Sequence, residues 1–399
     1  MRIHQRMRHA ALVLALGGTI TLAGVSTSFA ADTLRPDVAK PLNAAQNLYR
    51  AHKYQDALAQ IAAASAVPNK TPYEMYMVEE MRGAAAVAAG NSGLAAQAYE
   101  TLLASGQLKG DEVQHITATL AGIYFQEHSY PKAIATGERY LKAGGSDPQM
   151  QTLIVESYYQ SNDFANATKL LKSTVDAQIR AGHAPDESEL QLLGTCAQRA
   201  KDDAAYRSAL EALVAYHPKQ SYWDDLFTAI RGKSGYSSRL DIDTYRLRRA
   251  TGSLSTADDY MEMTQLALVA GSTAEAKQVI DQGFTSGVLG RDAQAEREKR
   301  LQALATKRAQ GVAADNAQAP APVDDGLNRV FAGKASDGIA MMQAAIAKGT
   351  DHPDEAQLHL GVAYYVAGQK ARAVQTFRAV KGSDGSADLA HLWLLVASK

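Results

Sequence analysis

The sequence contains little cysteine and no excess of charge of one sign. Its 399 residues include one cysteine, Cys196, so no disulfide can form within the chain and no cysteine pair is available to hold zinc. The ten histidines show no pair at the spacing of a helical metal site. The 41 basic residues nearly balance the 42 acidic ones, whereas binding to nucleic acid phosphates needs a basic surface. We therefore expect no metal, no cofactor and no nucleic acid partner.

Long apolar runs are missing after the first thirty residues. Within those residues, Arg2, Arg6 and Arg8 precede an uncharged apolar stretch, and the small residues Ser28 and Ala30 stand at its end. This order is typical of a secretory signal peptide, so we predict a signal peptide over residues 1–30 with cleavage after its last residue. The prediction implies an exported protein, which we expect in the periplasm, with no stable membrane anchor after cleavage. An uncleaved N-terminal anchor is the alternative.

Local signatures of catalysis are also missing. The chain has no Gly-x-Ser-x-Gly sequence. Lys233 and Ser234 resemble the end of a phosphate-binding loop, but Phe227 stands where that motif needs glycine. Cys196 is expected in the middle of a helix as a small buried residue and not as an activated thiol. We predict that the protein is not an enzyme, while an active site assembled from distant residues stays an open alternative.

A repeat of helix pairs runs through the chain. Residues 359–380 read as helix, tight turn and helix, because Gly361 and Tyr364 share one helical face and Ala373 and Phe377 share another. The same order of small and apolar residues recurs, and the good copies begin at Ala45, Gly83, Ala121 and Val155, with weaker copies at Gly194 and Thr264. One helix pair cannot bury its own apolar stripe, so successive pairs must stack on one another.

These residues resemble the tetratricopeptide repeat family, at a period of 34 to 39 residues, although the tryptophan near the start of each unit is missing. The resemblance implies an all-α fold, a right-handed α-solenoid of helix-turn-helix repeats. A degenerate unit is expected around residues 219–255, where the repeated positions skip about two periods.

We expect four segments in the chain. The signal peptide is followed by a repeat solenoid over residues 31–290. A charged helix and a linker rich in alanine and proline follow over residues 291–325, and residues 311–325 are a candidate hinge. Residues 326–399 are expected to hold further repeats and a capping helix.

Two sets of repeated positions are candidate functional residues. Small residues should let paired helices approach closely, and they are Gly83, Ala95, Ala121, Ala133, Ala167, Gly361 and Ala373. The fourth residue after the small residue of each first helix falls on one stripe of that helix, and these residues are Tyr49, Val87, Phe125, Tyr159, Gln198, Leu268 and Tyr365.

The resemblance implies that this stripe lines a concave groove that holds peptides or helices. We predict that Tyr49, Val87, Phe125, Tyr159 and Tyr365 contact a partner, since aromatic side chains supply a large contact area at low entropic cost. Packing between adjacent repeats is the alternative for each of them.

A local basic bias marks the middle of the chain, in Arg231, Lys233, Arg239, Arg246, Arg248 and Arg249. It could receive an acidic partner or a membrane surface, but we expect a solvated helix face.

The resulting hypothesis is an exported scaffold or adaptor that binds a protein or peptide partner, in a more specific version as an accessory of a cell-envelope complex. The first alternative is a module that docks cell-wall polymer or regulates a cell-wall enzyme. Sugar binding favours exposed tryptophans, and we expect Trp223 and Trp393 in the core. An enzyme with a non-local active site is the third hypothesis.

Overall fold

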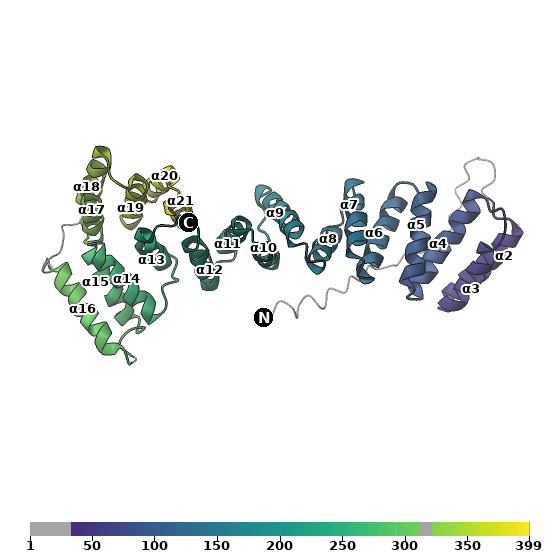
Figure 1. The fold of residues 1–399 in the computed structure, drawn as a ribbon, viewed down its shortest axis with the longest axis horizontal. Helices are drawn as coiled ribbons and strands as arrows, with labels where there is room; N and C mark the ends of the chain where they lie inside the picture. The colour runs from purple at the N-terminus through teal and green to yellow at the C-terminus, as the bar shows by residue number, and fades with distance from the viewer. Residues whose placement is uncertain (1–32, 292, 312–320, 399) are drawn as a thin grey trace. The chain divides into compact units, whose positions relative to one another are not determined.

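The part of the chain that the structure describes is built from helices and turns. The computed structural model describes residues 33–291, 293–311 and 321–398, and in this part of the chain it contains 20 α-helices, one short 3-10 helix and no strand (Figure 1). The predicted all-α fold of helix-turn-helix repeats is confirmed. None of the described helices combines the length and apolarity needed to cross a membrane. The predicted signal peptide, residues 1–30, lies outside the described residues.

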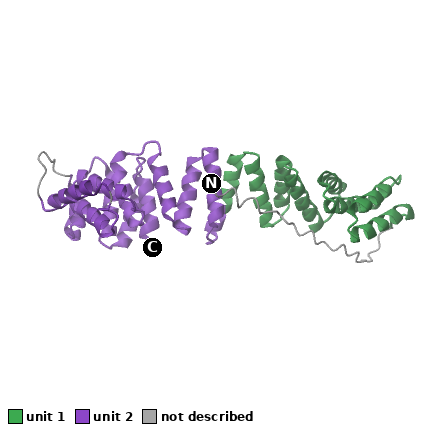
Figure 2. Cartoon of the chain, turned by 90° about the horizontal axis from the view of Figure 1, so that it is seen from below, with its two compact units in different colours: residues 1–174 green, residues 175–399 purple. Residues whose placement is uncertain are grey.

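The helices belong to two compact units, residues 1–174 and residues 175–399 (Figure 2). In unit 1, the two helices pack on one another in each of the first three pairs, and each of these pairs packs on the first helix of the next pair. Its helices are α2 (Pro36–Arg50), α3 (Tyr54–Ser65), α4 (Pro72–Ala88), α5 (Ser92–Ser105), α6 (Asp111–Gln126), α7 (Tyr130–Lys142), α8 (Pro148–Gln160) and the first part of α9 (Phe164–Arg180).

Unit 2 continues with helix pairs but is less regular. The predicted degenerate segment consists of α12, the 3-10 helix η2 and α13, and the predicted charged helix is α16. The remaining part of α9 is followed by α10 (Glu187–Ala200), α11 (Asp203–Tyr216), α12 (Gln220–Arg231), η2 (Ser238–Leu240), α13 (Asp241–Ala250), α14 (Ala257–Val269), α15 (Thr273–Thr285), α16 (Ala295–Ala309), α17 (Pro322–Phe331), α18 (Ala335–Lys348), α19 (Pro353–Val366), α20 (Lys370–Ala379) and α21 (Ser386–Ala397).

Helix α17 begins within the predicted linker. Residues 322–325 form its first turn, whereas we expected linker up to residue 325. Pro322 occupies the first turn, where a missing N–H group is tolerated, and Asp324 and Asp325 interact favourably with the positive end of the helix dipole. Residues 312–320 lie outside the described residues.

The turn within each helix pair is set by one residue with a left-handed backbone. His52, His128 and Asn162 have φ values of 56°, 58° and 62°. The N–H of the next residue bonds the carbonyl five residues back, as in Ser129 to Tyr124 at 2.8 Å. This bond satisfies a carbonyl that the helix end would otherwise leave unpaired. Glycine takes the same place in other pairs, for example Gly368 with a φ of 75°.

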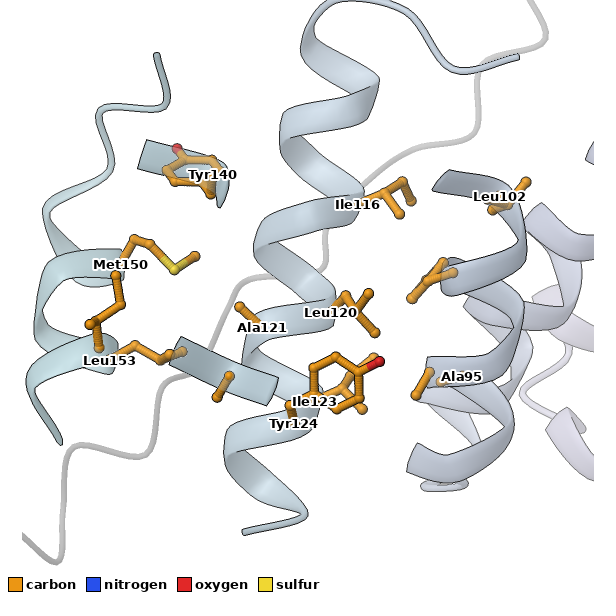
Figure 3. Packing of buried hydrophobic residues seen from close by; sticks show 14 of the residues in the cluster. Ala95, Leu102, Ile116, Leu120, Ala121, Ile123, Tyr124, Tyr140, Met150 and Leu153 are labelled. Atoms are coloured by element: carbon orange, nitrogen blue, oxygen red, sulfur yellow. The ribbon is translucent and has the colours of Figure 1, made fainter. Parts of the chain in front are cut away.

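Close approach of the paired helices depends on the small residues that the sequence singles out. A Cβ atom on Gly83 would lie 2.3 Å from Cε1 of Tyr99, and one on Gly361 would lie 2.4 Å from Cε1 of Phe377. The predicted packing alanines Ala95, Ala121, Ala133, Ala167 and Ala373 are fully buried. In Figure 3, Leu120 of α6 points toward Ala95 and Leu102 of α5, whereas Ala121 points to the opposite side of the helix.

Successive pairs in unit 1 are joined by tyrosine hydroxyls. Tyr124 of α6 donates to Oε1 of Glu100 in α5, and Tyr158 of α8 donates to Oε1 of Glu138 in α7 at 2.8 Å. Each tyrosine stands three residues after the small or apolar residue that begins its copy, and each glutamate stands five residues after the alanine of the preceding second helix. The bond therefore links equivalent positions of successive repeats.

The last helix is held on two sides in unit 2. The predicted capping helix α21 packs against α19 and α20, and α13 packs on it as well. Trp393 is 2% exposed and stacks on Phe377, with ring centroids 5.6 Å apart. Lys233 Nζ lies 2.8 Å from Oδ2 of Asp388, which ties residues 155 positions apart. Residues 233–250 and the C-terminal helix α21 therefore pack against one another within unit 2.

The glycine contacts lead to a stability prediction. Gly83→Ala should lower the free energy of unfolding by about 1–3 kcal/mol, because the buried Tyr99 ring has no room to move away from the added methyl group. Gly93→Ala is the matched control, since its Cβ atom would meet nothing nearer than 3.7 Å and alanine stabilises a helix by roughly 0.5–1 kcal/mol over glycine. Urea unfolding of both variants tests the contrast. Equal stabilities would contradict close packing at Gly83.

Candidate functional site

The predicted groove residues of unit 1 lie on four successive first helices. Tyr49, Val87, Phe125 and Tyr159 belong to α2, α4, α6 and α8, and each side chain is partly buried. They do not gather into one cluster. Tyr49 packs against the core of the first helix pairs, whereas Val87 and Phe125 pack against the next core cluster along the unit. Tyr49, Val87 and Phe125 therefore each have one side against a core cluster and the other accessible.

Three of these residues are supported by an aromatic ring from their own second helix. Tyr49 packs edge-on against Tyr54 with ring centroids 5.4 Å apart, and Tyr159 packs in the same way against Phe164 at 5.4 Å. Phe125 and Tyr130 form the equivalent pair at 5.8 Å. Edge-to-face pairs hold both rings in a defined orientation. The accessible sides are therefore rigid surfaces.

Two carboxylates share the stripe of these residues. Glu80 of α4 stands three residues before Gly83, and Glu156 of α8 stands one residue after Val155, so helical geometry places both on the face that carries the fourth-residue positions. We call Tyr49, Val87, Phe125 and Tyr159 together with Glu80 and Glu156 the first-helix face.

Burial makes both carboxylates harder to ionise. It raises the pKa of Glu80, and the nearby Glu112 raises it further by repulsion. Burial alone raises the pKa of Glu156. Within the described part of the chain, neither side chain has an ion pair or a hydrogen bond. The first-helix face therefore holds partly buried negative charge without a counter-charge.

The other predicted stripe positions lie elsewhere. Tyr365 belongs to unit 2 and packs against Trp393 of α21, with ring centroids 5.0 Å apart. Gln198 is exposed on α10, and Leu268 is partly buried on α14. Tyr365 thus packs on an aromatic side chain of the last helix and not on one from its own second helix. The groove role that we predict for it stays a prediction.

An ionic cluster lies inside unit 2. It consists of Asp243 and Arg246 of α13, Glu275 of α15, Asp324 of α17 and His359 of α19. The guanidinium of Arg246 donates from Nη2 to Oε2 of Glu275 at 2.8 Å and from Nη1 to Oδ1 of Asp243 at 2.9 Å. Nε2 of His359 lies 3.0 Å from Oδ2 of Asp243, and its Nδ1 lies 3.4 Å from Oδ1 of Asp324. The cluster thus connects four helices.

Asp243, Arg246 and His359 are charged at neutral pH although they are buried. Burial lowers the pKa of His359, but the neighbouring Asp243 and Asp324 outweigh burial and raise it to about 10. The pKa of the Asp243 carboxyl lies below its ordinary value, because His359 and Arg246 together outweigh its burial. Removing one partner of such a buried set is strongly destabilising, since it leaves an uncompensated charge. The cluster therefore fixes how these helices pack.

The basic bias in the middle of the chain is not a solvated helix face, contrary to our expectation. Arg246 is buried in the ionic cluster, and Arg248 pairs with Asp224 and Asp259, each at 2.9 Å. The remaining four residues also have acidic or polar partners, namely Asp241 for Arg231, Asp388 for Lys233, Glu355 and Asp384 for Arg239, and Gln282 for Arg249. The expectation failed because those partners are up to 155 positions away in the sequence.

A cavity of about 620 Å³ lies beside the ionic cluster, between α17, α18 and α19. Val323, Met341 and Ala356 line its apolar part, and Asp324 and His359 line its polar part. The latter two side chains already pair with one another. In the described residues, no three His, Cys, Asp or Glu side chains come together as metal ligands.

Two segments of the chain match a known family. The tetratricopeptide repeat family matches residues 80–148 and 324–388. Both segments are tetratricopeptide repeats. The first runs from α4 to the start of α8, and the second runs from α17 to the start of α21. The predicted repeat type is confirmed for these segments, whereas the exported type stays a prediction. No curated protein matches the chain.

Several solved structures resemble the chain weakly. The TPR domain of P58(IPK) is 14% identical, with 91% of this chain and 99% of that chain covered and a TM-score of 0.23. The TPR2AB domain of yeast Sti1 in its pHSP90 complex is 13% identical, with coverages of 73% and 100% and a TM-score of 0.24. Naa15/Naa10 bound to HypK-THB is 14% identical, with coverages of 88% and 58% and a TM-score of 0.32. These TM-scores are too low to support a conclusion.

Sequence reasoning found the aromatic positions of the repeats but missed the charged ones. Glu80 and Glu156 could have been found, because the same helical spacing places them beside the aromatic positions. The ionic cluster had no such signal, since Asp243 and His359 are 116 positions apart and belong to no common motif. Cys196 is buried as predicted, and burial raises the pKa of its thiol to about 11.

The raised pKa of His359 predicts a loss of stability in alkali. The folded protein holds this proton up to about pH 10, whereas an unfolded histidine loses it near 6.5, so the stabilising contribution is complete below pH 6.5 and disappears as the pH rises through about 10. Arg246, whose Nη1 lies 3.4 Å from Nε2 of His359, is the one cation of the cluster that opposes this effect. We expect the free energy of unfolding of unit 2 to fall over this range.

Tryptophan fluorescence can follow unit 2 in the full chain, because Trp223 and Trp393 both belong to it and the sequence has no other tryptophan. The pH dependence should become smaller in His359→Gln, leaving the part due to groups such as His391, whose pKa is raised by Glu211, and it should be unchanged in His183→Gln, a control at an exposed histidine. The same slope in wild type and His359→Gln would contradict a protonated His359.

Proposed function

We propose that the first-helix face of unit 1 binds a protein or peptide partner and that the chain is a scaffold and not an enzyme. One observation supports this most. Tyr49, Val87, Phe125 and Tyr159 recur at the same position of four successive first helices, partly buried and partly accessible. Rigid apolar surfaces repeated along a stack provide contact area with little entropy left to lose on binding.

The alternatives have less support from the molecule. A polymer-docking module would favour exposed tryptophan, but Trp223 and Trp393 are 6% and 2% exposed. An enzyme would need converging titratable groups beside a cleft, and the ionic cluster of unit 2 is the strongest candidate. Its arginine and carboxylates are paired with one another, which is typical of structural ion pairs.

Phe125→Ala combined with Tyr159→Ala should weaken partner binding by about tenfold or more, because it removes two of the three aromatic rings of the face. The free energy of unfolding should fall by less than about 3 kcal/mol, since both rings are only partly buried. Fluorescence anisotropy with labelled pools of short extended peptides measures the binding. Tyr216→Ala is the control, because Tyr216 is a 38% exposed aromatic residue outside the face.

Peptides that bind wild type and the double variant equally would contradict a role for the face. A much larger loss of stability than expected would instead favour packing between repeats, the alternative that the sequence leaves open for these residues.

We also propose that the protein is exported and acts in the periplasm as an accessory of a cell-envelope complex. The basic, apolar and small residues of the first thirty positions support export. Mass spectrometry of the protein from a periplasmic extract should find a mature chain that begins at Ala31. A full-length chain confined to the cytoplasm would contradict this proposal.

A further inference from the structure

We infer that the partner of the first-helix face presents lysine or arginine side chains among apolar residues. This inference rests on the proposed function, because it names the chemistry of the segment that the face would hold. Three observations carry it: the separation of charge between first and second helices, the absence of a counter-charge for Glu80 and Glu156, and the position of these carboxylates among apolar side chains.

Charge is separated between first and second helices in the pairs of unit 1 from α4 to α9, whereas the first pair shows the opposite balance, with Lys40 and Arg50 against Asp37 in α2 and Asp56 alone in α3. The first helices α4, α6 and α8 carry one basic residue, Arg82, against the acidic residues Glu74, Glu79, Glu80, Asp111, Glu112 and Glu156. The second helices α5, α7 and α9 show the opposite balance up to residue 174, with Lys132, Arg139, Lys142, Lys169 and Lys172 against Glu100 and Glu138. A segment that lies along α4, α6 and α8 therefore meets a negative surface.

The single basic residue of these first helices is not available to neutralise the face. Nη1 of Arg82 lies 2.8 Å from Oε1 of Glu79, and its Nη2 donates to Oγ of Ser65. Glu74 is likewise neutralised, since its carboxylate accepts from the guanidinium of Arg35 at 2.9 Å. Glu80 and Glu156 have no such partner in the described residues. The unpaired charge thus coincides with the face that carries the partly accessible apolar residues.

The neighbours of Glu80 indicate how a lysine or arginine side chain would bind beside it. Glu112 lies close enough to disfavour the charged form of Glu80, and the phenol groups of Tyr76 and Tyr99 are near as well. A lysine or arginine placed here would relieve the repulsion between the two carboxylates and could contact the faces of the aromatic rings. The apolar stem of the same side chain would pack against Tyr49 or Val87.

A neutral or acidic segment would bind poorly for the same reason. Any chain that covers the first-helix face removes water from Glu80 and Glu156, and burying an unpaired carboxylate is strongly unfavourable. A basic segment replaces that water with a counter-charge. The two glutamates therefore select the partner, while the aromatic residues provide most of its contact area.

The test uses the full chain and three pools of short extended peptides that share leucine, phenylalanine and tyrosine but differ in their remaining residues, which are lysine and arginine, glutamine and asparagine, or glutamate and aspartate. The basic pool should bind at least about tenfold more tightly than the other two. Its binding should weaken as salt is raised, because screening reduces attraction at a partly exposed face.

Glu80→Gln combined with Glu156→Gln should lower the affinity for the basic pool about tenfold and leave the neutral pool unchanged or bound more tightly. Asp56→Asn combined with Glu127→Gln is the control, because it removes the same charge from exposed residues outside the face. Circular dichroism and urea unfolding show whether each variant is folded.

The possible results of these experiments distinguish a failure of the basic-partner inference from a failure of the proposed function. Equal binding of all three pools, lost on Phe125→Ala and Tyr159→Ala, would overturn the preference for basic partners and keep the binding face. Equal weakening by the glutamate pair and the control pair would also overturn it, since net charge would then explain the effect. Absence of binding by every pool would overturn the proposed function itself.

Discussion

The two helices of a repeat pack in close contact, and this contact makes the other features of the fold possible. Gly83 and Gly361 stand where a methyl group would overlap the ring of Tyr99 or Phe377. The helix pair can therefore bury a large aromatic side chain only because the opposite residue is very small. A left-handed residue at the turn then sends the second helix back along the first. Every other contact of the repeat is built on this pair.

The same pairing explains why the aromatic residues of the first-helix face are rigid but accessible. The aromatic ring near the end of the first helix packs edge-on against the aromatic residue that begins the second helix, as Tyr159 does against Phe164. Its position is fixed by the turn and by one neighbour, so its other side remains open. Structural packing and partner binding are therefore compatible roles for one residue, and the two alternatives that the sequence leaves open do not exclude each other.

The two units use charge differently. In unit 1, tyrosine hydroxyls bond carboxylates of the preceding repeat, and Glu80 and Glu156 are left without a counter-charge. In unit 2, the buried carboxylates Asp243 and Glu275 are neutralised by Arg246 and His359. A paired buried charge specifies how helices pack, whereas an unpaired one on an accessible face favours a ligand of opposite charge.

The repeat can be recognised from the sequence alone, because each repeat is made from contacts between residues fewer than forty positions apart. Spacing alone therefore indicated the helix pairs, the small residues at their contact and the aromatic stripe, including Gly83, Ala121 and Phe125. The same spacing places Glu80 and Glu156 on this stripe, so these two charged positions are also predictable from the sequence.

The organisation of unit 2 depends on contacts between distant segments that the sequence does not reveal. Lys233 pairs with Asp388 and Asp243 pairs with His359, and these contacts join segments more than a hundred positions apart. Lys233 and Asp243 belong to the degenerate segment around residues 219–255, so no period predicts which charges meet. From the sequence, an arginine such as Arg246 is expected to be exposed to solvent. Arg246 can be buried because the fold places carboxylates from other helices beside it.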